Sequence, residues 1–193
     1  MGSQAMTARE ETRYTYADYC KWDTDDRYEL IDGVPYLMSP SPNHVHQDIA
    51  GKLYRVFGNH LEGKPCRVYC APLDVRLNAD SGDDTVVQPD VLVVCDKNKL
   101  GKGGVNGVPD LVIEVLSPSS RNYDSGLKLD IYLKAGVREC WIVNPEFNIV
   151  RVYIKNADGE ETVKTYGGSD TIPVGIIPGF SIPLKEIFEA AKL

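Results

Sequence analysis

The clearest hydrophobic pattern in this sequence is a repeat of four residues between Asn43 and Glu62. Apolar side chains recur once per turn there, at Ile49, Leu53, Phe57 and Leu61. This spacing predicts an amphipathic helix, and Gly63 stands where the helix would end.

Shorter apolar runs separated by turn residues predict a set of strands. Asp32-Gly33 lies between two such runs, within 27–38, and predicts a tight hairpin, because this dipeptide tolerates positive φ angles. Pro35 restricts the second hairpin strand to a sheet edge. Further strands are expected at 66–70, 73–77, 90–95, 110–116, 139–143 and 150–154, with a turn at 157–159.

The remaining segments predict three more helices and two irregular stretches. The helices are expected over 14–22 with Thr15 as a cap, over 121–135 with Gly136 as terminator, and over 183–191. Residues 78–84 predict a polar turn, and residues 97–107, rich in Gly and Lys, predict a mobile loop. The element order indicates an α/β (α+β) protein, with a mixed β-sheet flanked by helices and an N-terminal hairpin.

The length of 193 residues suits one domain. The first six residues, MGSQAM, are typical of a remnant left by an expression vector, so the domain is expected to span 7–193. No apolar run approaches the roughly 18 residues that cross a bilayer, and no apolar core typical of a secretory signal follows the first residue. These features predict a cytoplasmic protein without a membrane partner.

Five cysteines are scattered along the chain without a C-x-x-C pair. This pattern argues against a disulfide framework and a zinc site and is typical of a reducing compartment. Cys95 and Cys140 lie in apolar runs and are expected to be small buried hydrophobes. His44-x-His46 does not change the zinc argument, because two imidazoles at this spacing diverge at a helix start.

Two carboxylates interrupt apolar strands and are the leading candidates for chemistry. Asp90 opens the run Asp-Val-Leu-Val-Val, and Glu114 lies within Leu-Val-Ile-Glu-Val-Leu. On a strand, Glu114 shares a face with Val112 and Leu116. If the two strands are neighbours, both carboxylates converge, and a divalent cation would relieve their repulsion. Oxygen ligands of this kind suit Mg²⁺ or Mn²⁺.

Structural roles remain open for each acid alone. Asp90 could hydrogen-bond the loop before its strand, and Glu114 could pair with a buried Arg or Lys. The net charge of −7 also bears on function, because proteins that hold DNA by neutralising phosphates are usually basic.

Several motifs resemble a known nuclease group. Pro89-Asp90 followed by Glu114 in an apolar strand resembles the PD-(D/E)XK superfamily, which has the restriction-endonuclease-like fold. More closely, the sequence resembles the bacterial Uma2 family of restriction-endonuclease relatives, formerly a domain of unknown function. The stretches that carry this resemblance are 28–33 (YELIDG), 46–47 (HQ), 88–91 (QPDV), 109–119 (PDLVIEVLSPS) and 136–143 (GVRECWIV).

The resemblance implies metal-dependent hydrolysis of phosphodiester bonds in DNA, with Asp90 and Glu114 as ligands of Mg²⁺ or Mn²⁺. The superfamily motif has a lysine two residues after the glutamate, where this chain has Leu116. By resemblance, Lys128 on the following helix is the matching catalytic residue. The alternative for Lys128 is a surface side chain paired with Asp124 at helical spacing, which is worth only a few tenths of a kcal/mol.

Three further site residues follow from the resemblance. Glu29 is expected to be a third acid that completes the metal site, the alternative being an exposed cross-strand charge. His46 and Gln47 are expected to contact substrate phosphate or water near the site entrance. The family's relatives also imply a homodimer, whose two sites would address two DNA strands.

Two hypotheses about function therefore remain. The first is a Mg²⁺-dependent DNA endonuclease that uses Asp90, Glu114, Lys128 and Glu29. The second is a catalytically weak or inactive nuclease-fold module that serves in binding or assembly. The acidic net charge and the missing strand lysine favour the second hypothesis.

Overall fold

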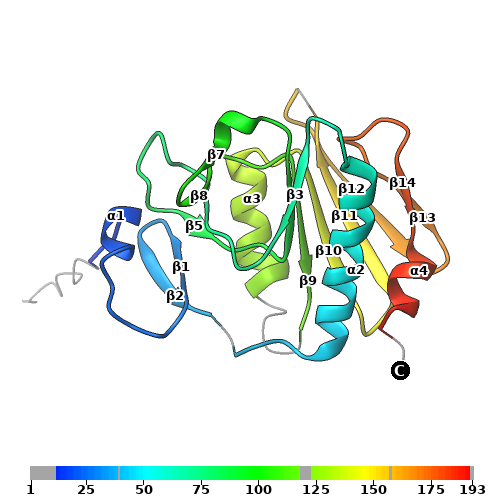
Figure 1. Cartoon of the computed structure of the whole chain (residues 1–193), viewed down its shortest axis with the longest axis horizontal. Helices are drawn as coiled ribbons and strands as arrows, with labels where there is room; N and C mark the ends of the chain where they lie inside the picture. The colour runs from blue at the N-terminus through cyan, green and yellow to red at the C-terminus, as the bar shows by residue number, and fades with distance from the viewer. Residues whose placement is uncertain (1–11, 39, 118–122, 157, 192–193) are drawn as a thin grey trace, which may run out of the picture.

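The computed structural model describes residues 12–38, 40–117, 123–156 and 158–191. Its core is a six-stranded sheet with the order β12-β11-β10-β9-β6-β3 (Figure 1). Strands β9 and β10 pair in parallel, and the other neighbouring strands of this sheet pair antiparallel. Strand β9 lies in the middle of the sheet, between β10 and β6. The strands are β3 (Arg67–Cys70), β6 (Val91–Val94), β9 (Leu111–Val115), β10 (Glu139–Asn144), β11 (Ile149–Lys155) and β12 (Glu161–Gly167).

A second sheet has the order β2-β1-β5-β4-β8-β7 and begins with the expected hairpin. Asp32 and Gly33 both adopt positive φ angles at its turn, and Pro35 lies in the edge strand, as predicted. A third sheet pairs β13 with β14. The bounds are β1 (Tyr28–Ile31), β2 (Val34–Leu37), β4 (Val75–Arg76), β5 (Val86–Val87), β7 (Leu100–Gly101), β8 (Gly104–Asn106), β13 (Thr171–Pro173) and β14 (Ser181–Pro183).

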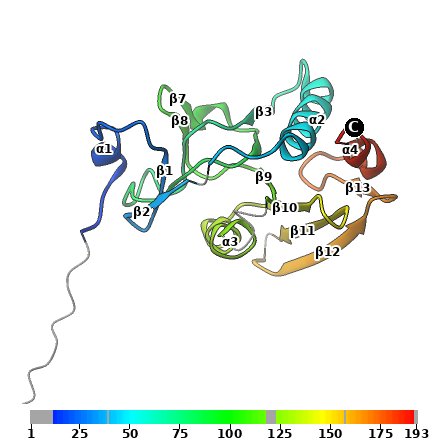
Figure 2. The ribbon, with the colours of Figure 1, turned by 90° about the horizontal axis from the view of Figure 1, so that it is seen from below.

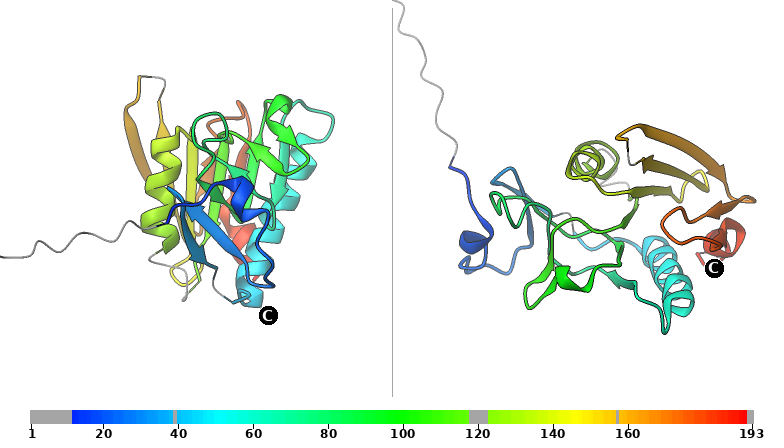
Figure 3. Two further views of the ribbon diagram at one scale, coloured as in Figure 1. Left: turned by 90° about the vertical axis from the view of Figure 1, so that its left-hand side faces the viewer. Right: turned by 90° about the horizontal axis from the view of Figure 1, so that it is seen from above.

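The central sheet is covered on both faces, because its strands are apolar on both sides. Helices α2 (His44–Leu61) and α4 (Leu184–Glu189), with β13 and β14, pack on one face. Helix α3 (Leu129–Ala135) and strands of the second sheet pack on the other (Figure 2). The hairpin and the short helix α1 (Tyr16–Tyr19) lie at the end of the molecule away from α4 (Figure 3).

The predicted helices are found, with shifted bounds. α2 buries Ile49, Leu53, Phe57 and Leu61, and Thr15 is the N-cap of α1. The helix expected over 121–135 is α-helical only from Leu129 and is preceded by a π-helical turn, η2 (Tyr123–Lys128). Gly136 ends α3 in a left-handed conformation, as predicted, whereas 121–122 and Ala157 lie outside the described residues.

The expectation of a mobile loop at 97–107 was wrong. The segment forms the 3₁₀ turn η1 (Lys97–Lys99) and the hairpin strands β7 and β8, and Val105 is fully buried against β4. Gly104 has a φ of +117°, and a Cβ there would lie 2.1 Å from the Asp74 carbonyl oxygen. Gly104 is therefore required for the close approach of β8 to the Asp74 backbone, and it does not indicate a flexible segment.

The argument against a disulfide framework missed one disulfide bond. Cys66 and Cys95 are bonded, and Cys95 is therefore not a free buried hydrophobe. The β3–β6 register pairs Arg67 with Val94, which places these two cysteines opposite each other. Cys140 is buried and free, as predicted. Because Cys66 and Cys95 are bonded, the cysteines do not support the expectation of a reducing compartment. None of the helices in the described part of the chain combines the length and apolar character needed to span a membrane.

Candidate active site

Strand register brings Asp90 and Glu114 together. β6 and β9 are antiparallel, with Val91 opposite Ile113, so Asp90 at the start of β6 faces the position of Glu114. The Val115 amide donates to Asp90 Oδ2 at 2.8 Å. The condition that these two strands be neighbours is therefore met, and within the described residues the Asp90 carboxylate accepts from β9 rather than from its own preceding loop.

Glu114 shares its strand face with Val112 and Leu116, as predicted, and the structure packs α3 on this face. Val112 and Leu116 contribute to the cluster beneath α3, whereas Ile113 and Val115 belong to the cluster beneath α2. The Glu114 side chain is only 2% exposed. A charge at this depth requires a partner, because burial without one is costly.

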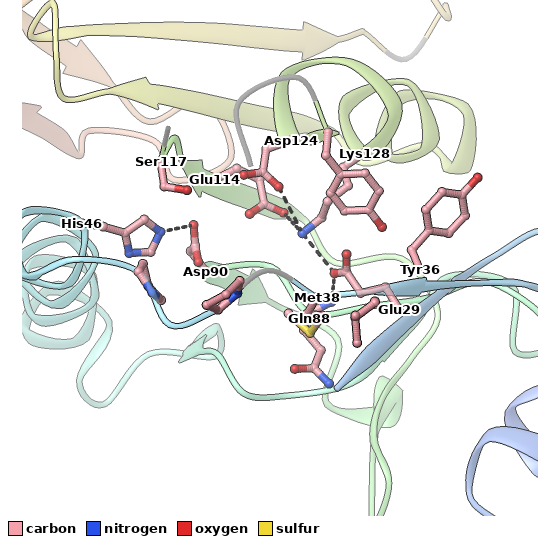
Figure 4. A pocket seen from close by; sticks show the side chains of 14 residues that line it. Glu29, Tyr36, Met38, His46, Gln88, Asp90, Glu114, Ser117, Asp124 and Lys128 are labelled. Atoms are coloured by element: carbon pink, nitrogen blue, oxygen red, sulfur yellow. Dashed lines mark hydrogen bonds and ion pairs between the residues drawn. The ribbon is translucent and has the colours of Figure 1, made fainter. Parts of the chain in front are cut away.

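Lys128 supplies that partner. Its Nζ atom lies 2.7 Å from Glu114 Oε1 and 3.0 Å from Glu29 Oε1, but 3.9 Å from Asp124 Oδ1 (Figure 4). The lysine side chain is 4% exposed. The interpretation of Lys128 as a surface residue paired with Asp124 was therefore wrong. The alternative proposed for Glu114, a buried ion pair with a lysine, is realised in the same contact.

The helix that carries Lys128 also carries a second group to Glu114. Tyr132 lies four residues after Lys128, hence on the same helix face, and its hydroxyl donates to Glu114 Oε1 at 2.6 Å. Leu129 and Tyr132 are buried against the sheet and anchor this helix. The π-helical turn before α3 ends at Lys128, and such turns often occur at functional sites.

Glu29 reaches the same point from the hairpin. It is 2% exposed, so the alternative of an exposed cross-strand charge was wrong. Its Oε1 atom accepts a hydrogen bond from the Gln88 backbone amide at 2.7 Å. The Gln88 side chain in turn donates to Asp74 Oδ1 at 2.8 Å and accepts from Arg27. Through these hydrogen bonds, Gln88 fixes the position of the hairpin relative to the segment that leads into β6.

The His46 side chain is a second group that contacts the Asp90 carboxylate, besides the Val115 amide. Asn43 caps α2 by accepting from the His46 amide, and His46 Nε2 lies 3.0 Å from Asp90 Oδ2. His46 is 6% exposed. Gln47, by contrast, is exposed and does not line the cavity in the described structure. The structure thus brings His46 to the acids, while substrate contact by His46 or Gln47 stays a prediction.

A cavity of about 290 Å³ opens onto these groups. Its floor contains the acids and Lys128, and one wall comes from the end of β2 and the segment that follows it. The lining residues are Glu29, Tyr36, Leu37, Met38, Pro40, Pro42, His46, Gln88, Asp90, Glu114, Ser117, Tyr123, Asp124 and Lys128.

Burial and neighbouring charges shift the pKa values at the cavity floor. Burial raises the pKa of Glu114 well above its ordinary value; Lys128 opposes this rise, and Asp90 adds to it. Burial acts to lower the pKa of Lys128, but Glu114 and Glu29 outweigh it and hold that pKa well above its ordinary value. Lys128 is therefore a buried cation at neutral pH, and strongly perturbed groups in a cavity are typical of functional sites.

The donor set of Asp90 and Glu114 fits a hard divalent cation. Within the part of the chain that the structure describes, the contacts given above fall on Oδ2 of Asp90 and Oε1 of Glu114, which leaves the second oxygen of each carboxylate for a ligand. Magnesium is commonly bound through one or two carboxylates and keeps several waters. Among the described residues, no three His, Cys, Asp or Glu side chains are grouped closely enough to hold an ion. Glu29 faces Lys128 instead, so its role as a third ligand stays a prediction.

Sequence reasoning missed Tyr132 and Gln88 as residues of this site. The spacing of four between Lys128 and Tyr132 was visible, and it could have marked Tyr132 as a partner of the same strand acid. Gln88 lies in the stretch 88–91 that carries the family resemblance, but its contact to Glu29 could not be predicted locally, because it runs through a backbone amide 59 residues away.

Comparison with known proteins gives consistent results. Residues 15–185 match the Uma2 family, described as "Putative restriction endonuclease". The uncharacterised protein slr1290 of Synechocystis sp. is 29% identical over 174 residues, which cover 89% of each chain. A crystal structure of a putative nuclease belonging to DUF820 from Anabaena variabilis aligns with a TM-score of 0.74 at 20% identity, covering 93% of this chain and 99% of that chain. At this identity, the structural likeness shows the fold, which is restriction endonuclease-like. Because the family match spans most of the sequence, the chain belongs to the Uma2 family of putative restriction endonucleases.

Proposed function

We propose that this protein is a divalent-metal-dependent endonuclease that hydrolyses phosphodiester bonds in DNA. The observation that carries the proposal is the position of Lys128, whose Nζ atom lies 2.7 Å from Glu114 Oε1 although the strand motif lacks its lysine. The ammonium of Lys128, at the end of η2, thus lies beside the strand glutamate, which supports its assignment as the substitute for the missing strand lysine. The family assignment supports the same reading.

Each residue has a distinct role in this proposal. Asp90 and Glu114 would hold Mg²⁺ or Mn²⁺, which supplies Lewis-acid chemistry at the scissile phosphate. Lys128 stays charged and donates hydrogen bonds to negative charge that develops on the phosphate oxygens. Glu29 keeps the ammonium in place through its 3.0 Å contact, and His46 orients Asp90. A homodimer would let two such sites cut both strands of a duplex.

Cleavage of plasmid DNA in Mg²⁺ or Mn²⁺ tests the proposal. The unaltered protein is expected to nick or linearise the plasmid, whereas Asp90→Ala and Lys128→Met lose this activity. Lys185→Met is the matched control, because the Lys185 side chain is 73% exposed and pairs with Glu189 on its own helix. Equal cleavage by the unaltered protein and Asp90→Ala would defeat the proposal, as would no cleavage by either.

A binding or assembly module is the second candidate, and one observation favours it. Lys128 already satisfies Glu29 and Glu114 in a closed cluster, which can stabilise a fold without any catalysis. Calorimetric titration with Mn²⁺ separates the two functions. An endonuclease should bind Mn²⁺ in a manner that Asp90→Ala abolishes, whereas a module of this kind should show no heat that depends on Asp90.

A further inference from the structure

One wall of the cavity, beside the acids, is apolar and aromatic. Tyr36 and Met38 come from β2 and the residue that follows it, and Pro40 and Pro42 continue the same wall. Apart from the Tyr36 hydroxyl, the side chains of this wall offer no hydrogen-bond donor to a phosphate group. The wall suits the flat face of an aromatic ligand, because aromatic rings stack in offset or tilted arrangements.

The register of the β1–β2 hairpin places this wall next to Glu29 and Lys128. Tyr36 lies directly opposite Glu29 in the β1–β2 pair, so both side chains project from the same face. The Tyr36 ring packs 5.6 Å from the ring of Tyr123, and Lys128 Nζ lies 5.9 Å from the centre of that second ring. Figure 4 shows Tyr36 beside the cluster of Lys128 and Glu29, with its hydroxyl directed away from them. The aromatic surface is therefore held next to the cavity floor.

Charge at the cavity does not favour binding through phosphates alone. Of the lining residues that the structure describes, Lys128 is the one cation, against Glu29, Asp90, Glu114 and Asp124. That cation is already shared by two carboxylates. The whole chain carries a net charge of −7. A divalent cation on Asp90 and Glu114 would attract the one phosphate it contacts, but the rest of the lining offers little positive charge to the neighbouring phosphates. Contacts that do not depend on charge would therefore add to the substrate affinity at this site.

We infer that the substrate of this site is DNA whose nucleotide at the cavity is unpaired, with its base packed against the wall of Tyr36 and Met38. This inference rests on the proposed nuclease function. In a duplex the bases are stacked inside, and only sugar and phosphate would meet the apolar wall. A single strand or a frayed end presents a base without the cost of unstacking it. The volume of about 290 Å³ lies at the small end of ligand pockets, which suits one such group.

The experiment compares one labelled oligonucleotide as a single strand and as a blunt duplex. Cleavage in Mn²⁺ is expected to be at least tenfold more efficient in kcat/KM for the single strand, because each base-pair step opened in a duplex costs about tenfold. Tyr36→Ala should reduce single-strand cleavage by roughly tenfold or more, the effect of losing one stacked base. Tyr36→Phe should restore it. Tyr54→Ala is the control, because Tyr54 is 39% exposed on α2 and lies outside the cavity.

A binding measurement without turnover separates this inference from the proposed function. Fluorescence anisotropy in Ca²⁺ should show tighter binding of the single strand, lost in Tyr36→Ala. The slope of log K against log salt should be no steeper than about −2, because few cations contact the backbone. Equal binding of both forms, a steeper slope, or no effect of Tyr36→Ala would overturn the inference, whether or not the protein cleaves DNA. Single-strand preference without cleavage would support it and defeat the nuclease proposal alone. If Tyr36→Ala does not fold, Met38→Ala takes its place, with the same expected loss.

Discussion

Replacement of Lys128 by methionine tests whether its ammonium compensates the buried charges of Glu29 and Glu114. The change keeps an unbranched apolar stem but removes an ammonium that lies 2.7 Å from Glu114 and 3.0 Å from Glu29. The two acids, both 2% exposed, would then face each other without a cation. Breaking a buried ion pair from one side costs about 3–5 kcal/mol, because the remaining charge is left uncompensated. Since either acid can take up a proton, we expect a loss near the lower bound, about 3 kcal/mol.

Urea denaturation at neutral pH measures this loss. Glu114→Gln and the Lys128→Met/Glu114→Gln double variant complete a double-mutant cycle. The double variant should lose less than the sum of the single losses by about 2 kcal/mol, because contacting residues do not add. Mn²⁺ at about 100 times its Kd should return about 2.7 kcal/mol to Lys128→Met, the binding contribution expected at that excess.

Two results would refute this reasoning. A loss below about 1 kcal/mol in Lys128→Met would mean that the ammonium does not compensate the buried carboxylates. Strict additivity in the cycle would mean that Lys128 and Glu114 do not interact in solution. Lys185→Met should change stability by no more than about 0.5 kcal/mol, as expected of an exposed site.

Three further predictions address the surroundings of the site and the core. Tyr132→Phe removes a 2.6 Å hydrogen bond to Glu114 and should cost about 1.5–3 kcal/mol in urea denaturation; an unchanged midpoint would show that the bond contributes nothing. Leu53→Ala, at a side chain that is 1% exposed, should cost about 2–5 kcal/mol in the same assay, and a smaller loss would contradict its place in the core. Burial raises the pKa of Glu139 in the folded protein, so the folded state binds this proton more tightly than the unfolded chain. Stability should therefore fall as pH rises from the ordinary carboxyl pKa towards the raised value, and Glu139→Gln should flatten that slope; equal slopes in both proteins would refute the assignment.

Elements with a strong local signal were predicted well. The repeat of Ile49, Leu53 and Phe57 identified α2, and Asp32-Gly33 identified the hairpin turn, because helix amphipathicity and positive φ are local properties. Strand alternation alone correctly predicted that Glu114 shares a face with Val112 and Leu116, and the structure shows that α3 covers this face. The short strand β5 and the pair of β13 and β14 were missed, because strands of two or three residues leave no periodic pattern.

Errors arose where long-range pairing overrides local composition. Residues 97–107 have the composition of a loop, yet Val105 is buried because β8 pairs with β4. Cys66 and Cys95 are 29 residues apart and form a disulfide because β3 and β6 are antiparallel neighbours. Neither the burial of Val105 nor the disulfide can be predicted from residues that are close in the sequence, because both depend on strand pairing over long separations.

The sequence by itself determined the family, the layered α/β fold and the two strand acids Asp90 and Glu114, because motifs and periodicity are properties of neighbouring residues. The tertiary structure alone decided that Lys128 is buried between Glu114 and Glu29 and not paired at the surface with Asp124. The two readings of Lys128 share the same helical spacing and differ only in which helix face meets the sheet. That choice depends on the packing of α3 through Leu129 and Tyr132 against β9 and its neighbours.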